Sequence, residues 1–260
     1  MHPQLHIAIS AARRAARVIT RSLDRPDTIV VQEKGNHDFV TDIDQAAEAE
    51  IIQVIRTAYP DHTIIAEETG ITQEGHEYVW IIDPLDGTTN FIHGFPQFAI
   101  SIAMARQGKL EIGLVYDPLK DELFTATRGQ GARLNNRRIR VSHCQQLKDA
   151  LIGTGFPYKE DQFQTYLQQF GAVLPVAAGI RRAGSAALDL AYLAAGRLDG
   201  FWESNLQYWD IAAGVLLIQE AGGLVTDFTG EKAFVEKRQL VAGTPKVHPL
   251  LRELISTHSG

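Results

Sequence analysis

Two aspartates three residues apart, directly after an apolar run, are the residues of this chain best suited to chemistry. Asp83 and Asp86 follow residues 80–82, with Pro84 between them and Gly87 after them. Proline fixes the turn and glycine allows a close backbone approach, so the two carboxylates can converge on one point. Two carboxylates and a backbone carbonyl suit Mg²⁺, which takes oxygen ligands. The alternative for this short motif alone is an aspartate–proline turn followed by an aspartate N-cap.

Phosphate is the anion that such a site would take. If a helix begins at residues 87–88, the free N–H groups of its first turn face the two aspartates and would hold a phosphate. The chain has 260 residues and a net charge of -6, which argues against broad binding to nucleic acid. An acidic protein that handles anionic phosphates needs cations, and a divalent metal ion is the obvious candidate.

Composition also bears on where the chain works. Cys144 is the single cysteine, so no intrachain disulfide is possible, which fits a reducing cytoplasm. No run reaches the ~18 consecutive apolar residues of a membrane-spanning helix. The N-terminal residues lack the basic and apolar regions of a signal peptide. We therefore expect a cytoplasmic protein without membrane contact.

The elements that position these residues fall into two patterns. Amphipathic helices are predicted at 5–23 and 41–59, with a strand at 29–33 and a polar loop at 34–37 between them. Further strands are predicted at 63–66, 78–82, 97–106, 110–116 and 122–127. Glycine and proline turns separate the last three strands, which is typical of an antiparallel meander.

From about residue 150 strands alternate with helices. Strands are predicted at 150–154, 198–202, 223–226 and 240–242, and helices at 161–170, 185–195, 207–220 and 247–257. A meander followed by alternating elements predicts an antiparallel α+β half, residues 1–146, joined to an α/β half, residues 147–260. No repeat or low-complexity linker separates the halves, so we expect them to pack as one body.

Several separated blocks of the chain, in order, resemble the inositol monophosphatase family. Residues 83–91 (DPLDGTTNF) resemble its first signature and residues 209–214 (WDIAAG) its second. Residues 65–69 (IAEET) are similar to a third block, with alanine in place of the usual glycine. Residues 181–189 and 195–203 resemble the bacterial branch. The resemblance covers nearly the whole chain and implies a layered αβαβα sandwich of the sugar-phosphatase type, with an antiparallel N-terminal sheet and a mixed C-terminal sheet.

The resemblance also implies the ligands of a metal centre. It implies that two or three Mg²⁺ ions bind to Glu67, Asp83, Leu85 (through its carbonyl), Asp86 and Asp210. Four carboxylates in one cleft repel one another without cations, so such a set needs metal ions. Taken alone, Asp210 at the start of a helix also fits an N-cap.

Water activation is assigned by the same resemblance. Thr88 matches the residue that orients the attacking water, Asp44 the carboxylate that supports it, and Glu67 a carboxylate that shares that water through its metal. Asp44 also follows Thr41 by three residues, as in a capping box at the start of a helix. The two roles of Asp44 are compatible.

The remaining implied residues would hold the substrate. The full substrate-binding set is Glu67, Leu85, Asp86, Gly87, Thr88, Arg181, Gly184, Ser185, Ala186, Glu203 and Asp210. Glu203 matches a glutamate that accepts hydrogen bonds from ring hydroxyls. Lys34 resembles a loop lysine that closes over the metals. For Arg181 and Lys34 the alternative is a solvent-exposed surface residue.

The activity implied is Mg²⁺-dependent, lithium-sensitive hydrolysis of myo-inositol monophosphate and related polyol phosphates by metal-activated water, in a homodimer. Phosphatases of histidinol phosphate, fructose 1,6-bisphosphate and 3′-nucleotides share such a metal site and are the alternatives. A second hypothesis is an additional regulatory role with a partner from the transcription or RNA-processing machinery. Its candidate surfaces are Arg13, Arg17, Arg21 and the basic run 137–140.

Overall fold

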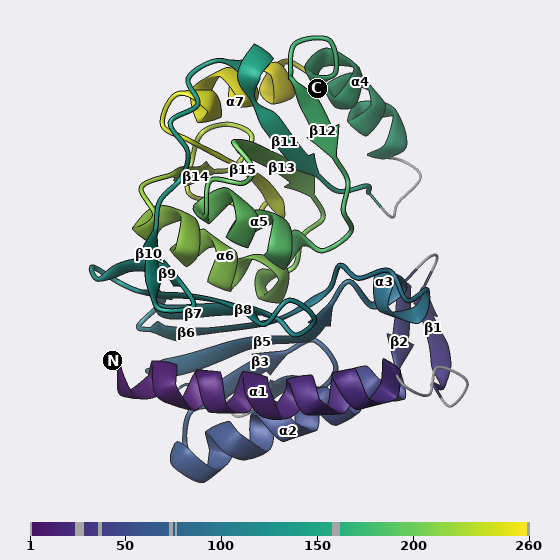
Figure 1. The fold of residues 1–260 in the computed structure, drawn as a ribbon, viewed down its shortest axis with the longest axis vertical. Coiled ribbons are helices and arrows are strands. Elements are labelled where there is room, and N and C mark those ends of the chain that lie inside the picture. The colour runs from purple at the N-terminus through teal and green to yellow at the C-terminus, as the bar shows by residue number, and fades with distance from the viewer. Residues whose placement is uncertain are drawn as a thin grey trace.

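Two β-sheets alternate with three layers of helices in the computed structural model, which describes residues 2–23, 29–35, 38–72, 75, 77–157 and 162–258 (Figure 1). One outer layer holds α1 (Pro3–Leu23) and α2 (Asp42–Ala58). The layer between the two sheets holds α5 (Ala186–Ala194) and α6 (Tyr208–Glu220), and the other outer layer holds α4 (Phe163–Val173) and α7 (Val247–Thr257). The expected αβαβα sandwich is confirmed. Among the described residues, no helix has the length and apolar character needed to span a membrane.

The first sheet has eight strands and is mixed. In spatial order they are β10 (Arg137–Ile139), β9 (Gly131–Leu134), β8 (Glu122–Thr127), β7 (Lys109–Asp117), β6 (Ala99–Arg106), β5 (Tyr78–Asp86), β3 (Thr63–Ala66) and β4 (Gly70–Thr72). The predicted meander is present, but the prediction of an antiparallel sheet is wrong at one pair, because β3 runs parallel to β5. The chain reverses into β4 on one side of β3 and reverses again into β5 on the other. Because the chain reverses twice, β5 runs in the same direction as β3.

The second sheet has five strands and is mixed, as expected. Its spatial order is β12 (Gly179–Arg181), β11 (Leu151–Thr154), β13 (Gly200–Ser204), β15 (Gln239–Gly243) and β14 (Leu224–Thr226). The strands β12, β11 and β13 are parallel, and β15 pairs antiparallel with β13 and with β14. A short 3₁₀ turn, η2 (Leu147–Asp149), precedes β11.

A small hairpin stands apart from both sheets. It pairs β1 (Val31–Gly35) with β2 (Asp38–Thr41), and Figure 1 shows it beside α3 (Thr88–Ile92). The predicted strand 29–33 therefore begins and ends two residues later, and Lys34 belongs to β1 and not to a loop. The side chains of residues 32–39 lie outside the described part, so the predicted role of Lys34 stays a prediction.

Alternation along β5 explains how the first sheet supports a site. Trp80 and Ile82 pack toward α1 and α2, whereas Ile81 packs toward α5 and α6. Both faces of the sheet are covered, so its central strands are apolar at nearly every position. Successive side chains of a strand point to opposite faces. Asp83, two residues after Ile81, therefore points toward the second half of the chain.

Polar side chains connect the two halves. The side-chain amide of Asn90 donates hydrogen bonds to the carbonyls of Gln97 (2.7 Å), Ala183 (2.9 Å) and Gly184 (3.2 Å). Ser101 donates to the Trp209 carbonyl at 3.2 Å. Asn90, a residue of the sequence motif 83–91, thus ties α3 to the segment just before α5. The division of the chain at residues 146 and 147 stays a prediction.

Candidate functional site

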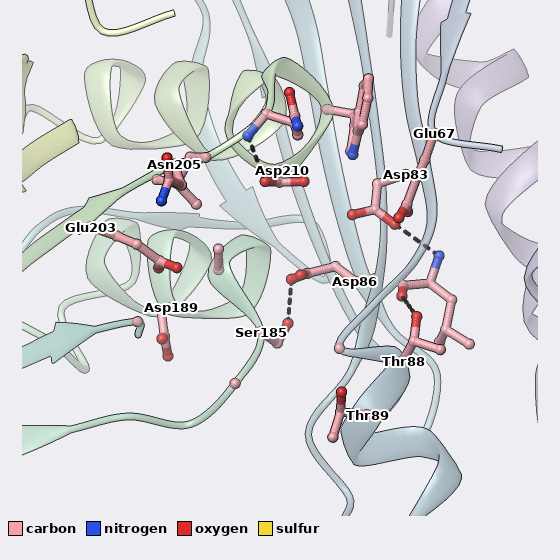
Figure 2. A pocket seen from close by; sticks show the side chains of 18 of the residues that line it. Glu67, Asp83, Asp86, Thr88, Thr89, Ser185, Asp189, Glu203, Asn205 and Asp210 are labelled. Carbon is pink, nitrogen blue, oxygen red and sulfur yellow. Dashed lines mark hydrogen bonds between the residues drawn. The ribbon is translucent and has the colours of Figure 1, made fainter. Parts of the chain in front are cut away.

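A cleft of about 810 Å³ lies where the carboxyl end of β5 meets the amino ends of α5 and α6 (Figure 2). The predicted residues that line it are Glu67, Asp83, Leu85, Asp86, Gly87, Thr88, Gly184, Ser185, Ala186, Glu203 and Asp210. Residues that the sequence reading did not assign also line it, including Asp189, Arg182, Asn205 and Arg238. Segments far apart in the chain therefore contribute to one concave surface.

The aspartate–proline–aspartate turn interrupts the pairing of β5. The register with β6 shifts between Asp83 and Asp86, as expected where Pro84 cannot donate a ladder hydrogen bond. The Asp83 carboxylate accepts a hydrogen bond from the Leu85 N–H at 3.0 Å, which closes the turn. Gly87 follows with φ of 99°. A Cβ there would lie 2.9 Å from the Gln97 carbonyl oxygen, so glycine is required on both counts.

Asp86 connects this turn to α5. Its Oδ2 accepts hydrogen bonds from the Ser185 hydroxyl (2.5 Å) and the Ala187 N–H (2.7 Å). Burial raises the pKa of Asp86 to about 6, although the hydrogen bonds from Ser185 and Ala187 oppose the rise. A buried carboxylate in such a position is stabilised by a nearby cation.

Thr88 and Asp44 are in direct contact. The Thr88 hydroxyl lies 2.8 Å from Asp44 Oδ1 and 3.1 Å from the Leu85 carbonyl oxygen. Asp44 Oδ2 also accepts from the N–H (2.8 Å) and the hydroxyl (2.5 Å) of Thr41, which completes a capping box at the start of α2. Both interpretations of Asp44 are therefore compatible with its contacts. Burial raises the pKa of Asp44, so these donors offset the cost of a carboxyl that is only 1% exposed.

The four carboxyls of the predicted metal centre reach the cleft from its two sides. Figure 2 shows Glu67, Asp83 and Asp86 on one side and Asp210 on the other. Asp83 is 2% exposed, and burial, then the charges of Glu67, Asp86 and Asp210, raises its pKa well above the usual range. Asp210 is the third residue of α6 rather than its N-cap; Gln207 is the N-cap and donates its N–H to Asp210 Oδ2 at 2.7 Å.

The donor set fits Mg²⁺ in its chemistry. It consists of carboxylate oxygens and a backbone carbonyl, which are the hard ligands that Mg²⁺ prefers. Mutual repulsion among Asp83 and its neighbours supplies the reason for a cation. Among the described residues, no three acidic, histidine or cysteine side chains gather at one point closely enough to hold an ion. The carboxyls are spread along the cleft.

Arginine placement differs from the prediction. Arg181 ends the edge strand β12, is exposed and donates to the carbonyl of Ile180 at 3.0 Å. It is not among the residues that line the cleft, and its predicted contact with substrate stays a prediction. Arg182 lines the cleft instead, with its guanidinium 4.7 Å from the ring centre of Phe156. Successive side chains of an extended chain point to opposite sides, so Arg181 and Arg182 point to different sides. The strand β12, which fixes the side to which each of them points, was not predicted.

The absence of a side chain at Gly155 leaves room for the carboxyl of Glu203. A Cβ on Gly155 would lie 1.9 Å from Glu203 Oε1, so any larger residue at position 155 would displace the carboxyl. Burial, then the charges of Asp189, Asp210 and Asp86, raises the pKa of Glu203 well above the usual range. Glu203 thus faces the cleft together with the carboxyls around it.

Glu48 supports the segment that carries Glu67, and sequence reasoning missed it. Its carboxylate is 1% exposed and accepts hydrogen bonds from the N–H groups of Glu68 and Thr69, both at 2.9 Å. Two backbone bonds from one carboxylate fix the turn after Glu67. The signal in the sequence is weak, because Glu48 and Glu50 look alike on a predicted helix.

We predict that Glu48→Gln weakens Mg²⁺ binding about tenfold or more, the usual effect of removing a partner that orients a metal ligand. The substituted amide cannot accept from both N–H groups, so Glu67 loses its fixed position. Titration calorimetry with Mg²⁺ measures the change. Glu50→Gln is the matched control, since Glu50 is on the same helix and bonds to Arg14. Equal Mg²⁺ affinity in both variants would contradict the positioning role.

Comparison with known proteins places the chain in a family. The model of the inositol monophosphatase family matches residues 1–259. The Nus factor SuhB of Pseudomonas aeruginosa is 53% identical over 99% of this chain and 97% of its own length. Extragenic suppressor protein suhB from Bartonella henselae superposes with a TM-score of 0.95 at 44% identity, over 98% of each chain. Inositol monophosphatase from Anabaena superposes with a TM-score of 0.88 at 38% identity, over 98% of this chain and 95% of its own. The chain belongs to the inositol monophosphatase family.

Proposed function

We propose that this protein hydrolyses myo-inositol monophosphate and related polyol phosphates to the free polyol and phosphate, with Mg²⁺ as cofactor. The observation that carries the proposal is the Thr88–Asp44 contact at 2.8 Å beside a cleft whose lining includes the four carboxyls of the predicted metal centre. Membership of the inositol monophosphatase family supports it. We further propose that the protein acts as a homodimer in the cytoplasm and that lithium inhibits it.

Two or three Mg²⁺ ions would be held by Glu67, Asp83, Asp86, Asp210 and the carbonyl of Leu85. Bound Mg²⁺ supplies positive charge that neutralises the carboxylates and the substrate phosphate, and lowers the pKa of water. The protein supplies the positions of these oxygens. The turn at Asp83 fixes two of them, and the start of α6 fixes the Asp210 carboxylate through the Gln207 N–H.

Thr88 would orient the attacking water. Its hydroxyl proton is directed to Asp44 Oδ1, so the oxygen lone pairs remain free to accept a hydrogen bond from water. Glu67 would accept a second hydrogen bond from the same water. The water oxygen would then attack phosphorus in line, and one water proton would pass to the Glu67 carboxylate. The bond from phosphorus to the polyol oxygen breaks, and the polyol oxygen takes a proton from solvent water. No covalent phosphoenzyme forms.

The polyol would lie against the second half of the chain. Glu203 accepts hydrogen bonds from its hydroxyls, and the backbone of residues 184–186 lines the same part of the cleft together with Gly87. These residues hold the leaving group while the carboxyl side holds the phosphate. One wall of the cleft would therefore bind the polyol, and the other would bind the phosphate.

The test is phosphate release from a panel of phosphate monoesters, with Mg²⁺ present. We expect the highest kcat/KM with myo-inositol monophosphate. The panel should include histidinol phosphate, fructose 1,6-bisphosphate and a 3′-nucleotide, and lithium should lower every rate. A higher kcat/KM with one of the other three would replace the proposed substrate, and no release from any compound would reject the phosphatase.

An additional regulatory role is the second candidate, because close relatives bear the name Nus factor SuhB. Arg13, Arg17 and Arg21 are exposed along α1, and Arg137 and Arg138 are exposed on the edge strand β10. We propose these surfaces as contacts for a partner from the transcription or RNA-processing machinery. Pull-down from cell extract with wild type and with Arg13, Arg17 and Arg21 changed to glutamate tests it. Identical captured partners would reject the α1 surface.

A further inference from the structure

Asp189 is a buried carboxyl in the cleft, and it belongs neither to the proposed metal ligands nor to the water-orienting pair. It lies one helical turn after Ser185 in α5, and only 2% of its surface is exposed, yet it lines the cleft. In the part of the chain that the structure describes, no protein group donates a hydrogen bond to its carboxyl. Its carboxyl oxygens therefore face the cleft as acceptors without a protein donor. A ligand that offers hydrogen-bond donors would satisfy them.

Asp189 and Glu203 face the same part of the cleft. They come from α5 and β13, and Figure 2 shows them as neighbours on the wall opposite Asp83. After burial, Asp189 is the leading cause that raises the pKa of Glu203. Glu203 likewise receives no hydrogen bond from the described residues. Two adjacent carboxyls therefore present acceptors without protein donors.

Neutral donors can satisfy this pair without a further cation. Arg182 lines the cleft, and its positive charge acts on both Asp189 and Glu203. That charge already offsets part of the negative charge of the pair. Hydroxyl groups donate one hydrogen bond each and bring no charge into the buried wall. A ligand with two hydroxyls on adjacent carbons matches two adjacent acceptors.

We infer that Asp189 accepts a hydrogen bond from a substrate hydroxyl next to the one that Glu203 accepts, and that Asp189 thereby determines specificity for polyhydroxylated leaving groups. The inference rests on the proposed function. Asp189 acts on substrate recognition, because Thr88, which would orient the water, lies on the other wall of the cleft (Figure 2).

The test compares two phosphate esters in wild type and Asp189→Asn. We expect kcat/KM for myo-inositol monophosphate to fall up to about tenfold, mainly through KM, since the asparagine oxygen still accepts the hydrogen bond but lacks the charge that makes such a bond roughly twice as strong. For 4-nitrophenyl phosphate, whose leaving group carries no further hydroxyl, kcat/KM should change less than about twofold. Glu253→Gln is the matched control, because it removes one exposed carboxylate that does not line the cleft.

An equal fall with both esters, or no fall with either, would overturn the inference. Thermal melts of Asp189→Asn separate misfolding from lost recognition, and Asp189→Ser supplies a second variant that keeps a small polar group. Calorimetric binding of myo-inositol monophosphate gives a reading independent of turnover. If wild type binds this compound about tenfold more tightly than Asp189→Asn but releases no phosphate, the recognition role stands and the proposed phosphatase fails.

Discussion

Thr88→Ala is expected to lower kcat about 100-fold or more, with little change in Mg²⁺ affinity. The Thr88 hydroxyl donates to Asp44 and leaves its oxygen free to orient water, and alanine removes both contacts. A loss of this size is typical for one well-placed catalytic group. Its hydroxyl is not among the proposed metal ligands, so calorimetric titration with Mg²⁺ should give nearly the wild-type affinity.

Thr88→Ser is the matched variant, because it keeps the hydroxyl that reaches Asp44. It should retain most of the wild-type kcat. Steady-state kinetics on both variants separates two roles for the residue. A rise in KM with kcat unchanged in Thr88→Ala would mean that Thr88 only contacts the phosphate.

Asp86→Asn is expected to change the response of the fold to Mg²⁺. Burial raises the pKa of Asp86 to about 6, above the ordinary value near 3.9. The folded state therefore holds the proton more tightly, and the ionised carboxyl destabilises the fold as the pH rises through about 6. Asparagine removes that charge and keeps an oxygen for the Ser185 and Ala187 hydrogen bonds. In chelator at pH 7.5 the variant should be no less stable than wild type.

With Mg²⁺ added the order should reverse. A ligand at about 100 times its Kd stabilises the folded state by about 2.7 kcal/mol per independent site. Asp86→Asn loses one proposed ligand and should gain less. Thermal melts of both proteins, each in chelator and in Mg²⁺, give the comparison. An equal Mg²⁺ shift in both would show that Asp86 is not a metal ligand.

The residues of contiguous motifs were the part of the site most open to prediction. Asp83, Asp86 and Thr88 lie in one nine-residue string, and a turn of fixed local geometry positions them. Glu67 and Asp210 come from separate blocks, so only the resemblance to a family joined them to that turn. The structure brings all five residues to one cleft.

Residues whose position depends on tertiary packing were beyond sequence reasoning. The short strands β4, β9, β10 and β12 have three or four residues each, too few for a period to be visible. The phase of β12 decides which of two adjacent arginines enters the cleft. Glu48 is buried and Glu50 is partly exposed, and no local sequence pattern shows this difference in burial. Asp189 could have been found, because it lies four residues after Ser185 on the same face of a predicted helix.

The central proposal is that the cleft with the four carboxyls of the proposed metal centre uses Mg²⁺ to hydrolyse a polyol phosphate. The most direct measurement is phosphate release from myo-inositol monophosphate by protein treated with excess chelator, before and after Mg²⁺ is restored. We predict no release in chelator and full recovery with Mg²⁺, because Asp83 and its three acidic neighbours cannot hold an anionic phosphate without cations. Full activity in excess chelator would contradict the proposal.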